Sequence, residues 1–336
     1  IVRGMMFLIS NYLSKGHSGV RPIVVETLIE MLNKSVHPVI PQKGSVGSSG
    51  DLAPSAHLAL VLLAKGEAIY KGKRMEGAKA MELASIAPLK LEAKEGLALT
   101  NNTSAQTSVA CHALYEAKTL IDLADICGAL SVEALRGTTK AFDKRIHELK
   151  AHKGQLLVAE RLRKLLEEST MIDNKKTQDQ YSLRCMPQIH GGVRQAIAYV
   201  EDVITTEINS VTDNPLIFTY DKGKTDVISG GNFHGEPIAI ALDTLGIAIS
   251  EIANTSDRRI ASLVDPATNN GLPAFLTPNG GVNSGMMILQ YTTAALVSEN
   301  KILAHPASVD SIPTSANVED LVSLGTIAAR KALEIT

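Results

Sequence analysis

Residues 43–54 read KGSVGSSGDLAP, and the rest of the chain is organised around this stretch. It places three glycines and three serines in the seven positions 44–50. An apolar run at residues 56–64 follows, which predicts a buried helix. Asp51 suits the cap of that helix because a short acidic side chain accepts hydrogen bonds from free N–H groups, and Pro54 is tolerated in a first turn. The pattern predicts a tightly bent loop on top of a buried helix.

The spacing of the glycines and serines alone allows three roles for this loop. It can be a plain glycine-rich turn, or a phosphate-binding loop, although it lacks the GxxxxGK[ST] spacing and no clear strand precedes it. In the third use, the backbone N–H of Gly50 attacks the carbonyl carbon of Ser48, which glycine permits because it has no Cβ to block the approach. Loss of one water closes a five-membered ring, and loss of a second water from Ser49 leaves an exocyclic methylidene. The product is an electrophile, which ordinary side chains do not supply.

Composition excludes several classes of function. The 336 residues can bury a large core, and length alone would allow two domains. A net charge of −2, 4% aromatic residues and no tryptophan argue against a nucleic-acid binder and against a polybasic membrane binder. The longest apolar region, residues 238–253, carries Asp243 and Glu251, so no membrane span is expected. No signal peptide is visible, and a cytoplasmic location is the default expectation.

The three cysteines, Cys111, Cys127 and Cys185, are widely spaced and form no CxxC pair. This usage is typical of small buried thiols in a reducing compartment. The histidines show no metal-ligand spacing such as HExxH, so we assign no metal site.

The chain is predicted to be mainly α-helical. Helices are expected at residues 1–13, 22–34 and 105–135, with an irregular region at 67–95 that contains a small hairpin or short helix. Strand signals occur only locally, near residues 216–218 and 227–228. Long, apolar helices are expected at about 193–211, 235–264 and 281–304, and helices of this kind pack on one another as a bundle. We expect one helical domain over residues 1–336. Because the chain begins at Ile1 and ends in a helical pattern, we expect it to be a piece of a longer chain.

The loop, residues 44–54, resembles the signature of the aromatic amino acid ammonia-lyase family, and of its histidine-specific members in particular. Further motifs follow in the family's order along nearly the whole chain. They are ALTN (98–101), RIHE (145–148), QDQYSLRC (178–185), SVTDNP (210–215), SGGNFHGEP (229–237), NGGVNSG (279–285) and SVDSIPTSANVED (308–320). Several motifs in order are far more specific than any one of them alone.

This resemblance implies a long-helix bundle of the ammonia-lyase and fumarase-like type, with a central bundle built from several subunits. It implies a 4-methylidene-imidazol-5-one (MIO) group formed autocatalytically from Ser48, Ser49 and Gly50, with no metal and no PLP. The implied activity is that of a carbon–nitrogen lyase, which eliminates ammonia from L-histidine without oxidation to give trans-urocanate, the first step of histidine degradation. The chemical difficulty is that an α-ammonium leaves poorly and the β-hydrogen is weakly acidic, and an electrophile eases both steps.

The resemblance also assigns roles to single residues. Asn101 matches a donor to the ring oxygen, where negative charge develops. Tyr181 matches an active-site tyrosine. Phe233 would pack beside the MIO group, and the alternative is a phenylalanine of the core with a structural role only. In substrate binding, Gln178 matches a hydrogen-bonding residue. Arg184 suits bidentate capture of the carboxylate. Tyr181 and Arg184 are three residues apart and so share a face of a helical turn, with a surface pair as the alternative.

Glu319 carries the expected specificity, because a carboxylate can pair with an imidazole whereas phenylalanine-type relatives have an amide at the matching site. The alternative is a glutamate on the protein surface that takes no part in substrate binding. Phenylalanine or tyrosine ammonia-lyase and an MIO-dependent aminomutase remain alternative activities. An inactive oligomerising fragment is a second alternative.

The family forms homotetramers whose active sites take residues from three subunits. Apolar helices at 235–264 and 281–304, which one chain could hardly cover alone, agree with such an assembly. Tyr181, Arg184 and Phe233 would then meet Ser49 of another subunit. Residue 48 is serine where the family usually has alanine, and its side chain would only decorate the ring, so we expect cyclisation to survive. The family's N-terminal catalytic tyrosine and its C-terminal helices lie outside these residues.

Overall fold

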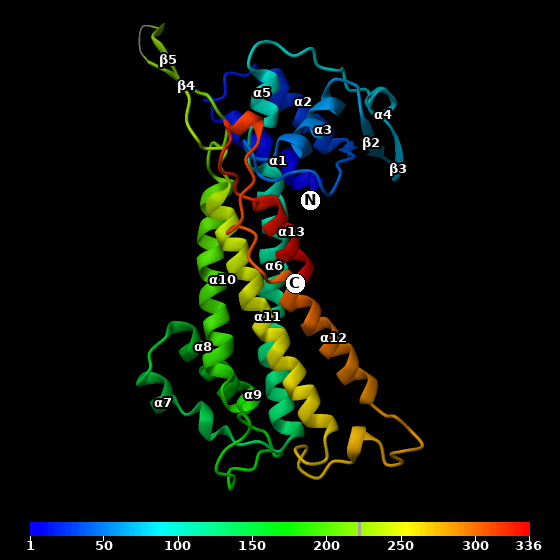
Figure 1. The fold of residues 1–336 in the computed structure, drawn as a ribbon, viewed down its shortest axis with the longest axis vertical. Helices are drawn as coiled ribbons and strands as arrows, with labels where there is room; N and C mark the ends of the chain where they lie inside the picture. The colour runs from blue at the N-terminus through cyan, green and yellow to red at the C-terminus, as the bar shows by residue number, and fades with distance from the viewer. Residues whose placement is uncertain (221–222) are drawn as a thin grey trace. The chain divides into compact units, whose positions relative to one another are not determined.

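The computed structural model of the chain describes residues 1–220 and 223–336, which form two compact units. The first unit comprises residues 1–113, 201–243 and 306–333, and the second comprises residues 114–200, 244–305 and 334–336. Three of the five boundaries between the units fall inside long helices: α6 (Ser104–Ala134), α10 (Met186–Ile208) and α11 (Glu236–Val264). The predicted mainly helical class is confirmed, while a single domain over residues 1–336 stays a prediction (Figure 1).

Three helices of the first unit share one apolar core. They are α1 (Val2–Ser14), α2 (Pro22–Asn33) and α3 (Leu52–Leu62). Pro22 is the first residue of α2. Proline is tolerated there because a backbone N–H at the first helical position would have no hydrogen-bond partner within the helix. Met6, Leu28 and Leu58, one from each helix, are fully buried in the same cluster. The helices predicted at 1–13 and 22–34 are therefore confirmed.

Two small antiparallel sheets belong to the first unit. One has the order β1 (His37–Pro38), β2 (Glu67–Tyr70), β3 (Lys73–Glu76), and the other pairs β4 (Leu216–Thr219) with β5 (Thr225–Ile228). A small hairpin or a short helix was expected within residues 67–95, and the region contains both, as β2–β3 and α4 (Gly77–Leu83). Two further helices, α5 (Glu95–Thr100) and α13 (Gly325–Ile335), flank the candidate site described below.

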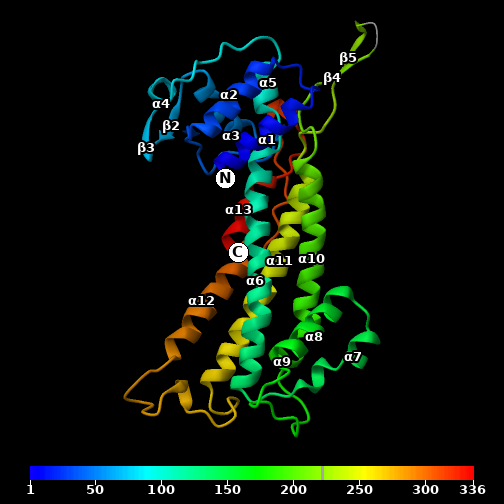
Figure 2. The same cartoon turned by 180° about the vertical axis from the view of Figure 1, so that it is seen from behind.

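The second unit is built on the continuing lengths of the long helices. Figures 1 and 2, which view the chain from opposite sides, both show α6, α10 and α11 side by side. Shorter elements complete the unit: η1 (Thr139–Phe142), α7 (Lys144–Glu148), α8 (Lys153–Leu165), α9 (Tyr181–Arg184), η3 (Ala274–Leu276) and α12 (Met287–Leu303).

Two predicted helix starts are wrong, each for a local reason. The helix predicted from residue 193 begins at Met186, because Pro187 is tolerated in the first turn of α10. The helix predicted from residue 281 begins only at Met287. Gly281 and Gly285 take φ of +92° and +52°, a left-handed backbone that an α-helix cannot contain.

The two apolar helices expected to need cover from other subunits differ in their burial. In α11, 67% of an apolar 18-residue window is buried inside the chain, so the expectation that one chain could hardly cover it is wrong. This helix is also long and apolar enough to cross a membrane, but a mostly buried core helix passes the same test. In contrast, α12 has no buried residue, and its Leu296 and Ile302 are 55% and 75% exposed.

The cysteines depart from the expectation of buried thiols. Cys127 is exposed, and Cys111 and Cys185 are half-buried. All three are free thiols.

Candidate functional site

The loop at residues 44–54 is bent as predicted. Ser49 and Gly50 both take left-handed conformations, with φ of +47° and +74°. A Cβ at Gly50 would collide with the backbone carbonyl of Asn102 and lie 3.0 Å from the carbonyl oxygen of Phe233. Position 50 therefore accepts only glycine, for both its conformation and the close approach of two backbone segments.

Asp51 anchors this loop, but not in the predicted way. α3 begins at Leu52, directly after Asp51, yet the Asp51 carboxylate makes no hydrogen bond to that helix. It accepts one from the backbone N–H of Gln106 in the first turn of α6, at 2.8 Å, and another from the hydroxyl of Thr326 in α13, at 2.6 Å. Complete burial raises the pKa of Asp51 to about 6, although these hydrogen bonds lower it. Asp51 thus caps α6 and ties the loop to α13.

Asn101 lies where the resemblance predicted a donor. Its side-chain Nδ2 donates to the carbonyl oxygen of Ser49 at 2.9 Å, and only 4% of the residue is exposed. In a ring closed between Ser48 and Gly50, this carbonyl would become the ring oxygen. The other side-chain atom, Oδ1, is buried and has no hydrogen-bond partner among the residues that the structure describes.

Glu319 contacts the same loop through two hydroxyl groups. Ser49 Oγ donates to Oε1 at 2.6 Å, and Thr314 Oγ1 donates to Oε2 at 2.9 Å. The hydrogen bond from Ser49 lowers the pKa of Glu319, against the effect of partial burial. Thr314 and Glu319 also face each other in an isolated antiparallel bridge, which fixes the carboxylate over the loop.

The side chain of Ser48 has a partner in the uncyclised chain, and that it would only decorate a ring stays a prediction. Its Oγ lies 2.5 Å from Thr314 Oγ1. Because the single hydroxyl proton of Thr314 is donated to Glu319, Ser48 is the donor in this contact. Sequence reasoning missed Thr314, although it lies inside the motif at residues 308–320 that contains Glu319.

Phe233 is half-buried, and its backbone carbonyl packs against Gly50 of its own chain. It therefore belongs to the loop cluster, which we define as Ser48, Ser49, Gly50, Asn101, Phe233, Thr314 and Glu319. All of these residues lie in the first unit. A contact of Phe233 with Ser49 of another subunit stays a prediction.

The remaining predicted residues form a second group, in the second unit. Arg184 and Tyr181 share the single turn α9, and the guanidinium carbon lies 4.7 Å from the centre of the tyrosine ring. Arg184 Nη1 also donates to Gln178 Oε1 at 2.8 Å. The predicted shared face is thus confirmed, and a cation–π contact with one hydrogen bond holds the guanidinium. Tyr181 is 69% exposed, so most of its ring is free to meet another molecule.

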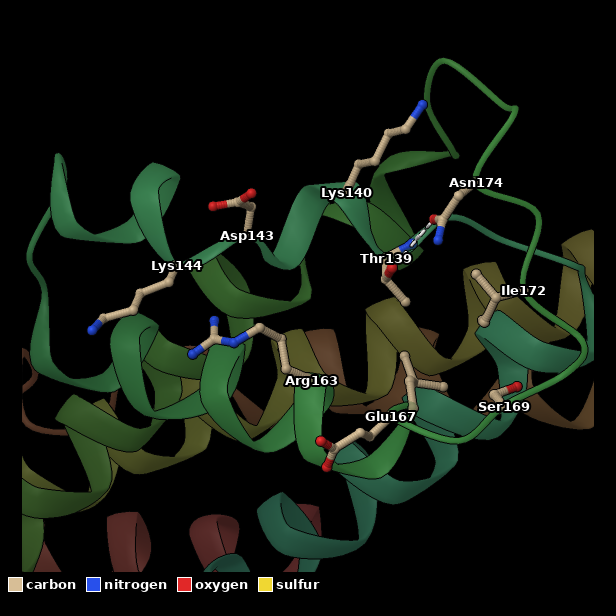
Figure 3. Close-up of a pocket in the computed structure, with 10 residues that line it drawn as sticks. Thr139, Lys140, Asp143, Lys144, Arg163, Glu167, Ser169, Ile172 and Asn174 are labelled. Carbon is tan, nitrogen blue, oxygen red and sulfur yellow. Dashed lines mark hydrogen bonds between the residues drawn. The ribbon is translucent and has the colours of Figure 1, made fainter.

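One cavity lies beside this turn, and another lies among other elements of the second unit. The first has a volume of about 560 Å³, and its lining includes Tyr181, Ser182, Arg258, Ser262, Asp265 and Gln290. The second, of about 590 Å³, lies among η1, α7, α8 and the segment 169–174 (Figure 3). Its lysines, Lys140 and Lys144, point in opposite directions, so the cations do not converge on one ligand position. None of the predicted site residues lines it.

No cluster of three or more histidine, cysteine, aspartate or glutamate side chains arranged for a metal occurs within residues 1–220 and 223–336. Two histidines are hydrogen-bonded to other parts of the chain. His147 is fully buried between the Ala141 carbonyl and the Gln155 side chain, and His234 lies 3.3 Å from the Leu321 carbonyl.

The residues at 48–50 fit the group that the resemblance implies. The backbone is already bent there, the space beside Gly50 excludes a side chain, and a buried amide donor points at the oxygen of Ser49. Asn101 would donate a hydrogen bond to the ring oxygen of an MIO group, and the backbone before and after residues 48–50 would hold the ring covalently.

Comparison with known proteins agrees with these features. The sequence model of the family described as "Aromatic amino acid lyase" matches residues 1–336. Histidine ammonia-lyase of Alkaliphilus oremlandii is 61% identical over 338 residues, covering 100% of this chain and 66% of the relative. The chain thus spans about two thirds of the length of such curated relatives.

Two solved structures are also similar. Histidine ammonia-lyase from Trypanosoma cruzi has a TM-score of 0.92 and 45% identity, covering 99% of this chain and 63% of that one. The phenylalanine aminomutase of Pantoea agglomerans has a TM-score of 0.95 and 37% identity, covering 99% of this chain and 68% of that one.

Proposed function

We propose, because this chain belongs to the aromatic amino acid lyase family, that its protein eliminates ammonia from L-histidine without oxidation and releases trans-urocanate. The observation that carries the proposal is the hydrogen bond between Glu319 and Ser49, which brings a carboxylate to the residue expected to provide the electrophile. The identities to histidine ammonia-lyases support the same substrate.

The electrophile would be an MIO group formed from Ser48, Ser49 and Gly50 with the loss of two waters. When formed, it supplies an electron-poor carbon that ordinary side chains lack. Asn101 donates to the oxygen on which negative charge develops. Because this donor is buried and already oriented, it needs no rearrangement when the charge appears.

The specificity for an imidazole would come from Glu319. In the uncyclised chain its Oε1 accepts from the Ser49 hydroxyl, and Oε2 accepts from Thr314. Cyclisation removes the Ser49 hydroxyl as water, so Oε1 loses its donor while Thr314 still holds the carboxylate. The freed oxygen can then accept an N–H group from the substrate imidazole.

Arg184 would bind the substrate carboxylate through its guanidinium, with Tyr181 and Gln178 orienting it. These residues are exposed or half-buried, which leaves them accessible to substrate. We further propose a homotetramer whose active sites combine residues of several subunits. The exposed apolar side chains of α12 support this assembly, since a monomer would leave them in water. A cytoplasmic location agrees with three free thiols.

Two measurements test the proposed function. The purified protein should form urocanate from L-histidine, followed by its ultraviolet absorbance, and no cinnamate from phenylalanine. Its intact mass should be lower than the sequence mass by about 36 Da, which corresponds to two waters. An unshifted mass together with no urocanate would favour an inactive oligomerising chain.

A sibling activity is the second candidate, because the phenylalanine aminomutase has the higher of the two TM-scores. Such an enzyme would form cinnamate or a β-amino acid from phenylalanine. Turnover of phenylalanine with none of histidine would replace the first proposal.

A further inference from the structure

We propose that three buried side chains outside the predicted site hold the α9 turn in place and so position the residues that bind substrate. They are Asp125 of α6, His190 of α10 and Arg259 of α11, all in the second unit. We call them the relay. Its effect on turnover rests on the proposed function, whereas its effect on the turn itself does not.

The α9 turn needs support from outside. It contains four residues, and its backbone closes through Arg184 N to Gln180 O at 3.0 Å and Cys185 N to Tyr181 O at 2.9 Å. One helical turn fixes several backbone angles for very few hydrogen bonds, so it is unstable alone. Tyr181 and Arg184, whose directions matter for binding, depend on whatever holds this turn.

Arg259 contacts the turn at its centre. Its Nη1 donates to the carbonyl oxygen of Ser182 at 3.4 Å, and Nη2 donates to Ser256 Oγ at 3.0 Å. Ser182 lies directly after Tyr181 and two residues before Arg184. Because Arg259 is only 2% exposed, water cannot replace these partners.

His190 orients Arg259 from the other side. Its Nε2 lies 3.4 Å from Arg259 Nη1, and its Nδ1 lies 2.8 Å from Asp125 Oδ1. Arg259 has only N–H donors, so Nε2 must accept, which assigns the proton of the neutral ring to Nδ1 and makes Asp125 its acceptor. Burial lowers the pKa of His190, although the hydrogen bond to Asp125 raises it, and this agrees with a neutral ring.

Asp125 is the fixed end of the relay. It is fully buried, and its Oδ2 accepts from Arg161 Nε at 2.9 Å and from Arg194 Nη2 at 2.5 Å. A carboxylate held by two guanidinium groups and an imidazole has little freedom to turn. The relay therefore connects α6, α10 and α11 to the middle of α9 by a continuous line of hydrogen bonds.

A second contact from α11 supports the same turn. Ser262 lies three residues after Arg259, on the same face of the helix, and its hydroxyl donates to the side chain of Gln180, the N-cap of α9. One face of α11 thus holds both the start and the centre of the turn.

The decisive experiment is hydrogen–deuterium exchange of the full protein, followed in the peptide that spans residues 180–185. In His190→Leu the acceptor for Arg259 is lost, so the amides of Arg184 and Cys185 should exchange about tenfold faster. His190→Gln keeps both an acceptor and a donor and should restore most of the protection. His147→Leu is the matched control, since it also removes a fully buried histidine from the second unit, and that histidine is hydrogen-bonded to Ala141 and Gln155 and not to the relay.

Kinetics then test the consequence for the reaction. If the relay positions Arg184, His190→Leu should raise the KM for histidine about tenfold and change kcat by less than about threefold. The reason is that the bound substrate and the transition state would both lose the same contact with Arg184, so binding weakens while the barrier from the bound state changes little. The KM effect should largely vanish when Arg184 is already alanine, because the two changes then act on the same interaction.

Each result has a definite meaning. Unchanged exchange at residues 180–185 in His190→Leu, or equal acceleration in His147→Leu, would overturn the relay whatever the activity. Faster exchange with an unaltered KM would overturn its role in substrate binding. A wild-type protein that does not turn over histidine counts against the proposed function alone, and exchange still decides the relay. If His190→Leu does not fold, Arg259→Lys provides the same comparison.

Discussion

In the loop cluster, Ser49 is hydrogen-bonded at its carbonyl oxygen by Asn101 and at its hydroxyl by Glu319, and the glycine beside it is buried. In α9, by contrast, Tyr181 projects 69% of its surface to solvent, and the turn is held from behind by α11. The groups around the loop thus point inward at Ser49, whereas α9 presents the Tyr181 ring outward. Under the proposed function, the chain itself would preorganise the reactive centre, whereas the binding groups of α9 would meet the rest of the site from another subunit.

Ser49→Ala should have the largest effect and tests the first half of this comparison. Without the hydroxyl, the methylidene carbon cannot form, so urocanate formation should fall by at least about a thousandfold. The mass deficit should drop from about 36 Da to 18 Da or less. Ser48→Ala is the matched control, since it removes the neighbouring hydroxyl and its contact with Thr314 but leaves cyclisation possible. Equal loss in both variants would mean that the loop acts through its hydrogen bonds alone.

Asn101→Ala sharpens the comparison by removing the fixed donor while keeping the loop sequence. We expect kcat to fall by about 10²–10³-fold, as for the loss of one preorganised donor to a developing oxyanion. The intact mass is measured alongside. A full mass deficit with reduced kcat assigns the effect to the reaction, and an unchanged kcat would contradict the role of this amide.

Arg184→Ala tests the other region of the comparison, the α9 turn. Losing a charge-assisted partner for the substrate carboxylate should raise KM by about 10–100-fold, with a smaller change in kcat. The intact-mass deficit should stay at its wild-type value, because α9 takes no part in ring formation. Arg258→Ala is a suitable control, since this neighbouring arginine lines the cavity beside α9 but pairs with Asp257. A lost mass deficit in Arg184→Ala would break the separation between the two regions.

The last prediction concerns the stability of the chain and the buried Asp51. Burial raises the pKa of Asp51 in the folded chain to about 6, above the ordinary value of an aspartate, so the folded state binds the proton more tightly than the unfolded state. Stability from this group is therefore present below about pH 4 and is lost as pH rises through 6, by about 3 kcal/mol at most. Urea denaturation of wild type and Asp51→Asn between pH 4 and 7 should show the wild type losing stability relative to the variant. Parallel pH profiles would contradict this assignment.

Local patterns predicted the elements well wherever the signal lay in neighbouring residues. Helices α1, α2 and α11, the short strands and the bent loop follow from apolar spacing, proline and glycine. The predicted starts of α10 and α12 are wrong for local reasons. A proline fits within the first turn of α10, so this helix begins earlier than predicted, and two glycines in left-handed conformations delay the start of α12. The side chain of Asp51 was assigned to the nearest helix, whereas its partners are 55 residues away in α6 and 275 residues away in α13.

The helical class, the bent loop at residues 48–50 and the motifs around it could be predicted from the sequence, because they depend on periodicity and on residues that are contiguous in the chain. Which side chains come into contact could be read only from the folded chain. Thr314 between Ser48 and Glu319, the capping of α6 by Asp51 and the relay behind α9 all join residues far apart in sequence. The physical reason is that buried hydrogen bonds are selected by the packing of whole elements, and spacing along the chain carries no information about which buried donor will meet which acceptor.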